Sequence, residues 1–95
     1  MPTTVVFTEA ARAALLEILD HIARDSPAAA LAFVDTLETR LVTTLGTFPE
    51  AGPRFQGDLR FHVIRGYAFV YRHDAESESV FILDVFGPRE NWRPE

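Results

Sequence analysis

The side chains able to do chemistry are arginines, histidines and carboxylates. All nine basic residues are arginine, and there is no cysteine. A thiolate nucleophile, a disulfide framework and a cysteine-based zinc site are therefore excluded. The histidines His21, His62 and His73 fall on different expected elements without the spacing of metal ligands, so we expect neither a metal site nor a cofactor.

Charge and composition restrict the function further. The 95 residues carry a net charge of -5, with 47% apolar and 24% charged residues. This acidic balance argues against a protein that binds nucleic acid by neutralising many phosphates, although a local arginine patch stays open. No apolar run is long enough to span a bilayer and no signal peptide is evident, so a cytoplasmic location is the expectation.

Three strands are expected in the C-terminal half, between Leu59 and Val85. They are rich in β-branched and aromatic residues and are separated by short polar segments. The dipeptide Arg65-Gly66 suits a two-residue hairpin, because glycine tolerates a positive φ. That hairpin would pair Arg60 with Tyr71 and His62 with Phe69.

The N-terminal half predicts one strand and two helices. Residues 5–7 form an edge or parallel strand, and a helix capped by Thr8 runs to about Arg24. Ser26-Pro27 starts a second helix that ends near Leu45, before Gly46 and Pro49. Residues 50–58 read as a loop. Residues 1–95 are thus expected to form one α+β domain of order β-α-α-β-β-β, with a helical hairpin packed on a small, mainly antiparallel sheet.

Several short motifs follow one another along nearly the whole chain. They are Phe7-Thr8-Glu9-Ala10, Ser26-Pro27 with Ala28, Ala29 and Phe33, Phe48-Pro49 with Gly52, Leu59-Arg60, Tyr67 to Tyr71-Arg72, and Val85 with Arg89 and Trp92. In their order and spacing these motifs resemble the RelE/ParE superfamily of toxins from bacterial toxin-antitoxin pairs, and within it the ParE branch. The resemblance implies a type II toxin that a ParD-like antitoxin neutralises in a hetero-oligomer.

The superfamily contains two activities, and the residues favour one of them. RelE-like members cleave ribosome-bound mRNA with basic residues at positions that here fall on Gln56, Asp58 and Ala68. An alanine cannot stabilise a phosphate and an aspartate would repel one. Only Arg60 and Arg89 match basic positions, and the tail lacks the tyrosine or histidine of the nucleases. We therefore expect no enzyme activity.

ParE-like members act by binding DNA gyrase, which requires a surface and no catalytic group. Arginine and tryptophan are frequent interface anchors. The predicted partner-binding residues, on the open sheet face and the tail, are Arg60, Arg72, Arg89 and Trp92. Each also has a structural interpretation: the arginines of the strands could pair with carboxylates such as Asp84 or stack on Tyr71, and Trp92 could pack the tail onto the sheet.

Two questions stay open at this point. We expect the face with Tyr67, Phe69 and Tyr71 to meet the helices, which would leave an apolar open face and a protein that is poorly soluble or dimeric without its partner. The alternatives to gyrase binding are an mRNA endonuclease built from Arg54, Arg60 and Arg89, and a non-toxic module that only binds antitoxin.

Overall fold

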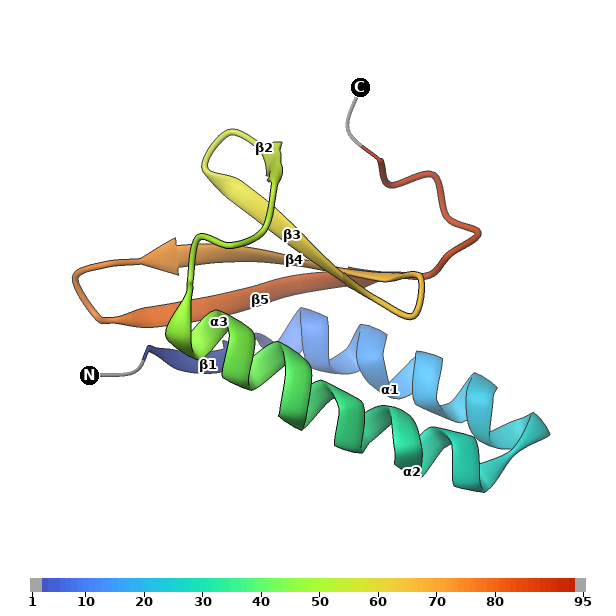
Figure 1. Ribbon diagram of the computed structural model, residues 1–95. Coiled ribbons are helices and arrows are strands. Elements are labelled where there is room, and N and C mark those ends of the chain that lie inside the picture. Colours follow the sequence, from blue (N-terminus) through green and yellow to red (C-terminus); the bar gives the residue numbers. More distant parts are fainter. Residues whose placement is uncertain (1–2, 94–95) are drawn as a thin grey trace.

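The computed structural model describes residues 3–93 and shows a helical layer on one face of a five-stranded sheet (Figure 1). The sheet order is β1-β5-β4-β3-β2, with β1 parallel to β5 and the other pairs antiparallel. The α+β class is confirmed. The elements are β1 (Thr4–Phe7), α1 (Glu9–Asp25), α2 (Pro27–Thr36), η1 (Leu37–Val42), α3 (Thr43–Thr47), β2 (Arg54–Gln56), β3 (Leu59–Ile64), β4 (Tyr67–Asp74) and β5 (Ser79–Phe86).

Both helix starts are capped as the sequence predicts. The Thr8 hydroxyl accepts a hydrogen bond from the Ala11 amide and donates one to the Ile82 carbonyl, which ties the start of α1 to β5. The Ser26 hydroxyl accepts a bond from the Ala29 amide, and Pro27 occupies the first position of α2. These caps satisfy amides that a helix start otherwise leaves without a partner.

The second predicted helix is one continuous rod from Pro27 to Thr47, with a feature that the sequence did not indicate. Its middle, η1, is a π-helical segment between α2 and α3. Leu37 and Leu41 of this segment and Leu45 of α3, four residues apart, are all buried. The rod ends next to Gly46, close to the predicted boundary.

The β3-β4 hairpin has the predicted register, with Arg60 opposite Tyr71 and His62 opposite Phe69. Its turn residues Arg65 and Gly66 both have positive φ, of 53° and 84°. Two positive φ values match a type I′ turn, whose twist suits a two-residue hairpin.

One part of the predicted order is wrong. Residues 50–58 do not form only a loop, because Arg54–Gln56 pair with β3 as the edge strand β2. The glycines and prolines around this segment concealed it. Phe55 accounts for the strand: its ring lies 6.3 Å from the ring of Phe61 on β3 and 6.4 Å from that of Phe86 on β5.

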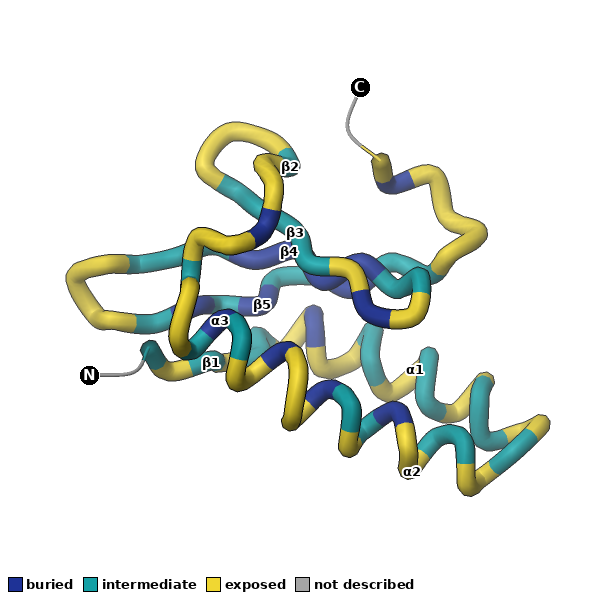
Figure 2. The backbone as a smooth tube through the Cα atoms, viewed as in Figure 1, coloured by how far each residue is buried: buried dark blue, intermediate teal, exposed yellow. Residues whose placement is uncertain are grey.

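The main core lies between the helices and the sheet, and it uses the face that we expected. Phe69, Tyr71 and Ile82 from the sheet are fully buried against Phe33 and Leu41 from the helical rod. Figure 2 shows the buried positions of α2 and α3 on the side that faces the sheet. The larger burial of aromatic rings decides this orientation.

The opposite sheet face is not the exposed apolar surface that we expected. Four aromatic residues from β2, β3, β5 and the C-terminal tail cover it, with Ala68 and Val70 buried beneath them. Among the described large apolar residues of this face, Val6 and Val63 are exposed, at 38% and 40%. We call this group the aromatic cluster; its members are Phe55, Phe61, Phe86 and Trp92.

Candidate functional site

Arg60, the first predicted partner-binding residue, belongs to a structural network. Its side chain shares a face with Tyr71 and is 23% exposed. A guanidinium N–H donates to the Gly52 carbonyl at 2.9 Å, and the Tyr71 hydroxyl accepts the Gly52 amide at 2.9 Å. Side chains of the sheet therefore bind both the amide and the carbonyl of Gly52. Arg60 therefore fixes the approach to β2, and its predicted place on the open face is wrong.

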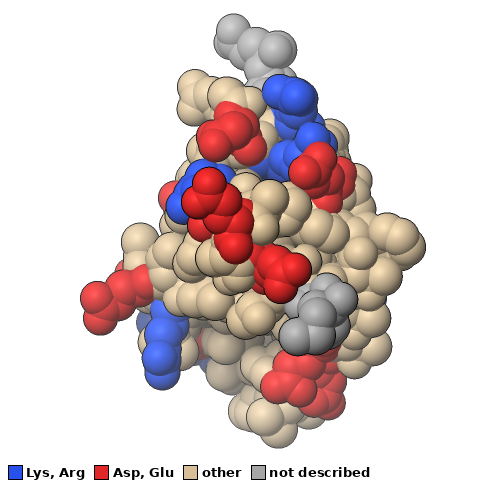
Figure 3. All heavy atoms as spheres, turned by 90° about the vertical axis from the view of Figure 1, so that its left-hand side faces the viewer, with Lys and Arg blue, Asp and Glu red and all other residues tan. Residues whose placement is uncertain are grey.

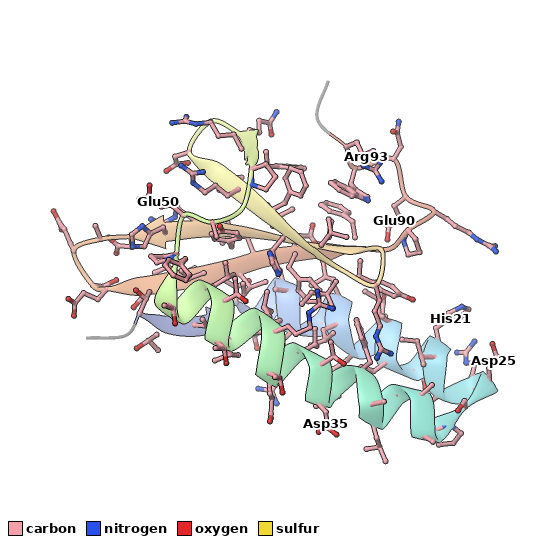
Figure 4. All side chains as sticks on the ribbon, viewed as in Figure 1. His21, Asp25, Asp35, Glu50, Glu90 and Arg93 are labelled. Carbon is pink, nitrogen blue, oxygen red and sulfur yellow. The ribbon has the colours of Figure 1, made fainter. Side chains whose placement is uncertain are left out.

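A small polar cleft of about 220 Å³ lies beside Arg60. Glu50, labelled in Figure 4, has one carboxylate oxygen 3.0 Å from Nδ1 of His73 and the other 3.6 Å from the Arg60 guanidinium. Arg54 and Asp58 complete the lining. The cleft thus places an imidazole, two guanidinium groups and two carboxylates together, which sequence reasoning missed because they come from three separate segments.

Arg72 lies on the face opposite Arg60, since it follows Tyr71 in β4. Its guanidinium carbon is 5.4 Å from the centre of the Phe81 ring, a cation–π contact across the strands. The predicted alternative partner, Asp84, makes no ion pair with either Arg60 or Arg72 within residues 3–93. Its carboxylate instead accepts the Val85 amide at 2.8 Å.

Arg89 lies at a larger groove between α1 and the end of β5. The groove has a volume of about 700 Å³. Its α1 wall includes Ile18 and His21, and its tail wall includes Arg89 and Glu90. Figure 4 labels His21 on α1 and Glu90 on the tail, on the same side of the molecule. Arg89 itself is exposed.

Trp92 packs as its structural interpretation predicts. It is only 7% exposed, its ring centre is 5.0 Å from that of Phe61, and the Arg93 guanidinium lies over it. The structure therefore does not bring the four predicted residues together. Arg60 borders the polar cleft, Arg72 lies on Phe81, Arg89 borders the groove, and Trp92 closes the aromatic cluster.

The positions that carry cations in a nuclease lie in unsuitable surroundings. Gln56 and Asp58 are exposed near the turn between β2 and β3, and Ala68 is fully buried opposite Val63 and Phe86 on the neighbouring strands. A phosphate at Ala68 would lose its water without gaining a cation. The surroundings of Ala68 are therefore apolar and suit the packing of apolar groups.

One face of the molecule carries charges of both signs, and the described residues offer no cluster of metal-ligating side chains. Acidic and basic groups are interspersed on the side that carries the β4-β5 turn (Figure 3). No group of three or more metal-ligating side chains occurs within residues 3–93. Over the same residues, no helix combines the length and apolar character needed to cross a membrane.

Two titratable groups of the sheet, the half-buried His62 and the fully buried Tyr71, have shifted pKa values. Burial, followed by the positive charge of Arg40, lowers the pKa of His62. Burial also raises the pKa of the Tyr71 hydroxyl, against the opposing effect of the Gly52 hydrogen bond. Neither group lies in the groove or the polar cleft, so both shifts report on packing.

Comparison with known proteins agrees with this architecture. A chain of the RelBE2 toxin-antitoxin complex from Mycobacterium tuberculosis is 24% identical, with a TM-score of 0.65 and 95% of each chain covered. A chain of the chromosomal ParDE system from P. aeruginosa is 21% identical, with a TM-score of 0.69 and coverage of 98% of this chain and 97% of that one. These likenesses show the fold.

Sequence comparison assigns the family. No curated protein sequence matches the chain. The family model described as the ParE toxin of the type II toxin-antitoxin system, parDE, matches residues 5–92, which is nearly the whole chain. This match covers the capped helices, the aromatic cluster and the groove described above. The chain therefore belongs to the ParE toxin family of type II toxin-antitoxin systems.

Proposed function

We propose that this toxin inhibits DNA gyrase by binding it, without catalysis of its own, and that a ParD-like antitoxin neutralises it. The observation that carries the proposal is the state of the open sheet face. Ala68 is buried there under apolar and aromatic side chains, where a phosphate-cleaving relative would need a cation. A protein-binding toxin has no such requirement.

Two of the four predicted residues stay available for the target. Arg89 is exposed, and Arg72 is partly exposed above Phe81. Arginine on an aromatic ring or beside a groove is a frequent anchor in interfaces between proteins. Arg60 and Trp92 hold the toxin's own loop and tail, so their replacement would act through folding.

The antitoxin partner is supported by family membership. The two similar structures are also described as toxin-antitoxin assemblies. Exposed apolar side chains on the helices provide surface that a partner could cover, namely Leu16 at 58% and Leu31 at 71% exposure.

Supercoiling by purified gyrase tests the proposal. We expect the toxin to inhibit supercoiling, and Arg89→Ala and Arg72→Ala to weaken inhibition. Arg24→Ala is the matched control, because Arg24 is an exposed arginine on α1 whose ion pair is with Asp20, four residues earlier. Unchanged inhibition in both variants would contradict the assignment of these residues, and a wild-type toxin that never inhibits gyrase would contradict the target.

One observation favours a second candidate, an mRNA endonuclease. The polar cleft brings Arg54 and Arg60 next to His73, whose imidazole is oriented by Glu50. A positioned imidazole can act as a general acid or base, and arginines can hold a phosphate. Arg89, expected in that set, borders the separate groove. Loss of ribosome-bound mRNA cleavage in His73→Ala, but not in His21→Ala, would support this candidate.

A further inference from the structure

The outward face of helix α1 carries opposite charges on the two sides of an exposed leucine. Leu16 lies near the middle of α1 and is 58% exposed. Arg12 precedes it by four residues and Asp20 follows it by four residues, and both are exposed. Residues four apart share one face of a helix. Along one line, α1 therefore presents a cation, an apolar side chain and an anion.

The other side of α1 packs on the core of the protein. Ala11 is fully buried, and Leu15 and Ile18 are partly buried against the core cluster. Figure 2 shows exposed positions recurring along the helix. Single exposed leucines are common on protein surfaces, so the charges that flank Leu16 decide what this face fits.

A second copy of the same chain is complementary to this face. A twofold axis at Leu16 would bring two α1 helices together antiparallel, so that the same surface meets itself. Arg12 and Asp20 lie at equal distances from Leu16, about 6 Å along the helix axis in opposite directions. Arg12 of each copy would then face Asp20 of the other, and Leu16 would meet Leu16. Ala13, exposed and three residues before Leu16, leaves room for close packing beside the leucine.

The same charges select one arrangement and limit its strength. In a parallel arrangement arginine would face arginine and aspartate would face aspartate, which is repulsive. Asp20 also pairs with Arg24 of its own helix at 3.0 Å, but both side chains are exposed and such a pair is weak. Glu17 adds an unfavourable term, because it lies on the flank of this face and brings like charges nearer across the axis.

We propose that the free toxin forms a weak, symmetric dimer through α1, with Leu16 on the twofold axis and reciprocal ion pairs between Arg12 and Asp20. One helix face gives a small interface, so the dimer forms only at high concentration. Arg72 lies on the sheet face away from the helices and stays accessible in both copies. The inference goes beyond the proposed function, because it concerns the toxin alone.

Sedimentation equilibrium of the full chain measures the dimer, and charge exchange tests its geometry. Arg12→Glu should weaken the dimer by about 30-fold, because symmetry turns two attractions into two repulsions of similar size. Asp20→Arg should weaken it to the same extent. Glutamate and arginine are good helix formers, so α1 should be retained, and far-UV circular dichroism checks this.

The decisive sample is an equimolar mixture of the two variants. Each copy of one variant then meets opposite charges on the other, so the mixture should associate about as tightly as the wild type. A mixture as weak as the separate variants would overturn the inference. A wild-type protein that stays monomeric up to about 1 mM would also overturn it.

Leu16→Glu tests the position of the axis, with Val63→Glu as its control. Leu16→Glu places like charges opposite each other at the axis and should abolish the dimer. Val63 is 40% exposed on the open sheet face, and Val63→Glu should leave the dimer unchanged. The opposite result would show that two copies meet through the open sheet face, which would contradict the proposal. Sedimentation contains no gyrase, so failure here leaves the proposed target untouched.

Discussion

The hydroxyl of Tyr71 should be essential for the position of β2. This residue is fully buried, and its oxygen accepts the amide of Gly52, also buried, at 2.9 Å. In Tyr71→Phe the ring is kept, so the core loses little apolar contact. The Gly52 amide, however, is left in a buried position without its acceptor.

The size of the effect follows from that orphaned donor. A buried donor that loses its partner costs about 1–3 kcal/mol, and we take about 2 kcal/mol here. With a urea slope of about 1.5 kcal/mol/M for a chain of this size, the midpoint should fall by about 1.3 M. The slope itself should not change, because the surface exposed on unfolding is the same.

Urea unfolding followed by far-UV circular dichroism measures this loss, with Tyr67→Phe as the matched control. Tyr67 is partly buried against Phe33, and its hydroxyl makes no hydrogen bond within residues 3–93. The control should cost less than about 0.5 kcal/mol. Equal midpoints for the two variants would refute the role of the Tyr71–Gly52 bond.

Three further variants test other parts of the fold. Gly52→Ala should destabilise more than Tyr71→Phe in the same urea assay, because its Cβ would lie 2.2 Å from the Phe61 carbonyl; Gly87→Ala, with its nearest neighbour at 3.5 Å, is the control. Burial and Arg40 lower the pKa of His62 below its ordinary 6.5. The unfolded chain therefore binds the proton first, and stability should fall as pH drops through about 6.5; His62→Gln should remove that part of the pH dependence, and an identical dependence would contradict it. Trp92→Ala should lower the free energy of unfolding by about 3 kcal/mol by opening the aromatic cluster, whereas a change below about 0.5 kcal/mol would show that the tail packs loosely.

The sequence predicted the elements whose signals are local. Ser26-Pro27 marks a helix start by itself, and Arg65-Gly66 marks a hairpin that then determines the register of β3 and β4. The strand β2 was not predicted, because the glycines and prolines around Phe55 locally favour a loop. Phe55 lies in a strand because its ring packs on Phe61 and Phe86, which are distant in the sequence. The π-helical turn likewise has no local signature in these residues.

The candidate site was less predictable, for a related reason. Residue types identified Arg72 and Arg89 as possible anchors, but the fold distributes the four expected residues over separate surroundings. Arg60 has a structural role because its guanidinium binds the Gly52 carbonyl. The alternation of apolar and polar residues along a strand does not indicate such a contact.

We propose that the toxin acts by binding its target and not by cutting RNA. The most direct measurement applies one purified preparation both to gyrase supercoiling and to ribosome-bound mRNA. We predict loss of supercoiling with intact mRNA. Cleaved mRNA together with full gyrase activity would contradict the claim.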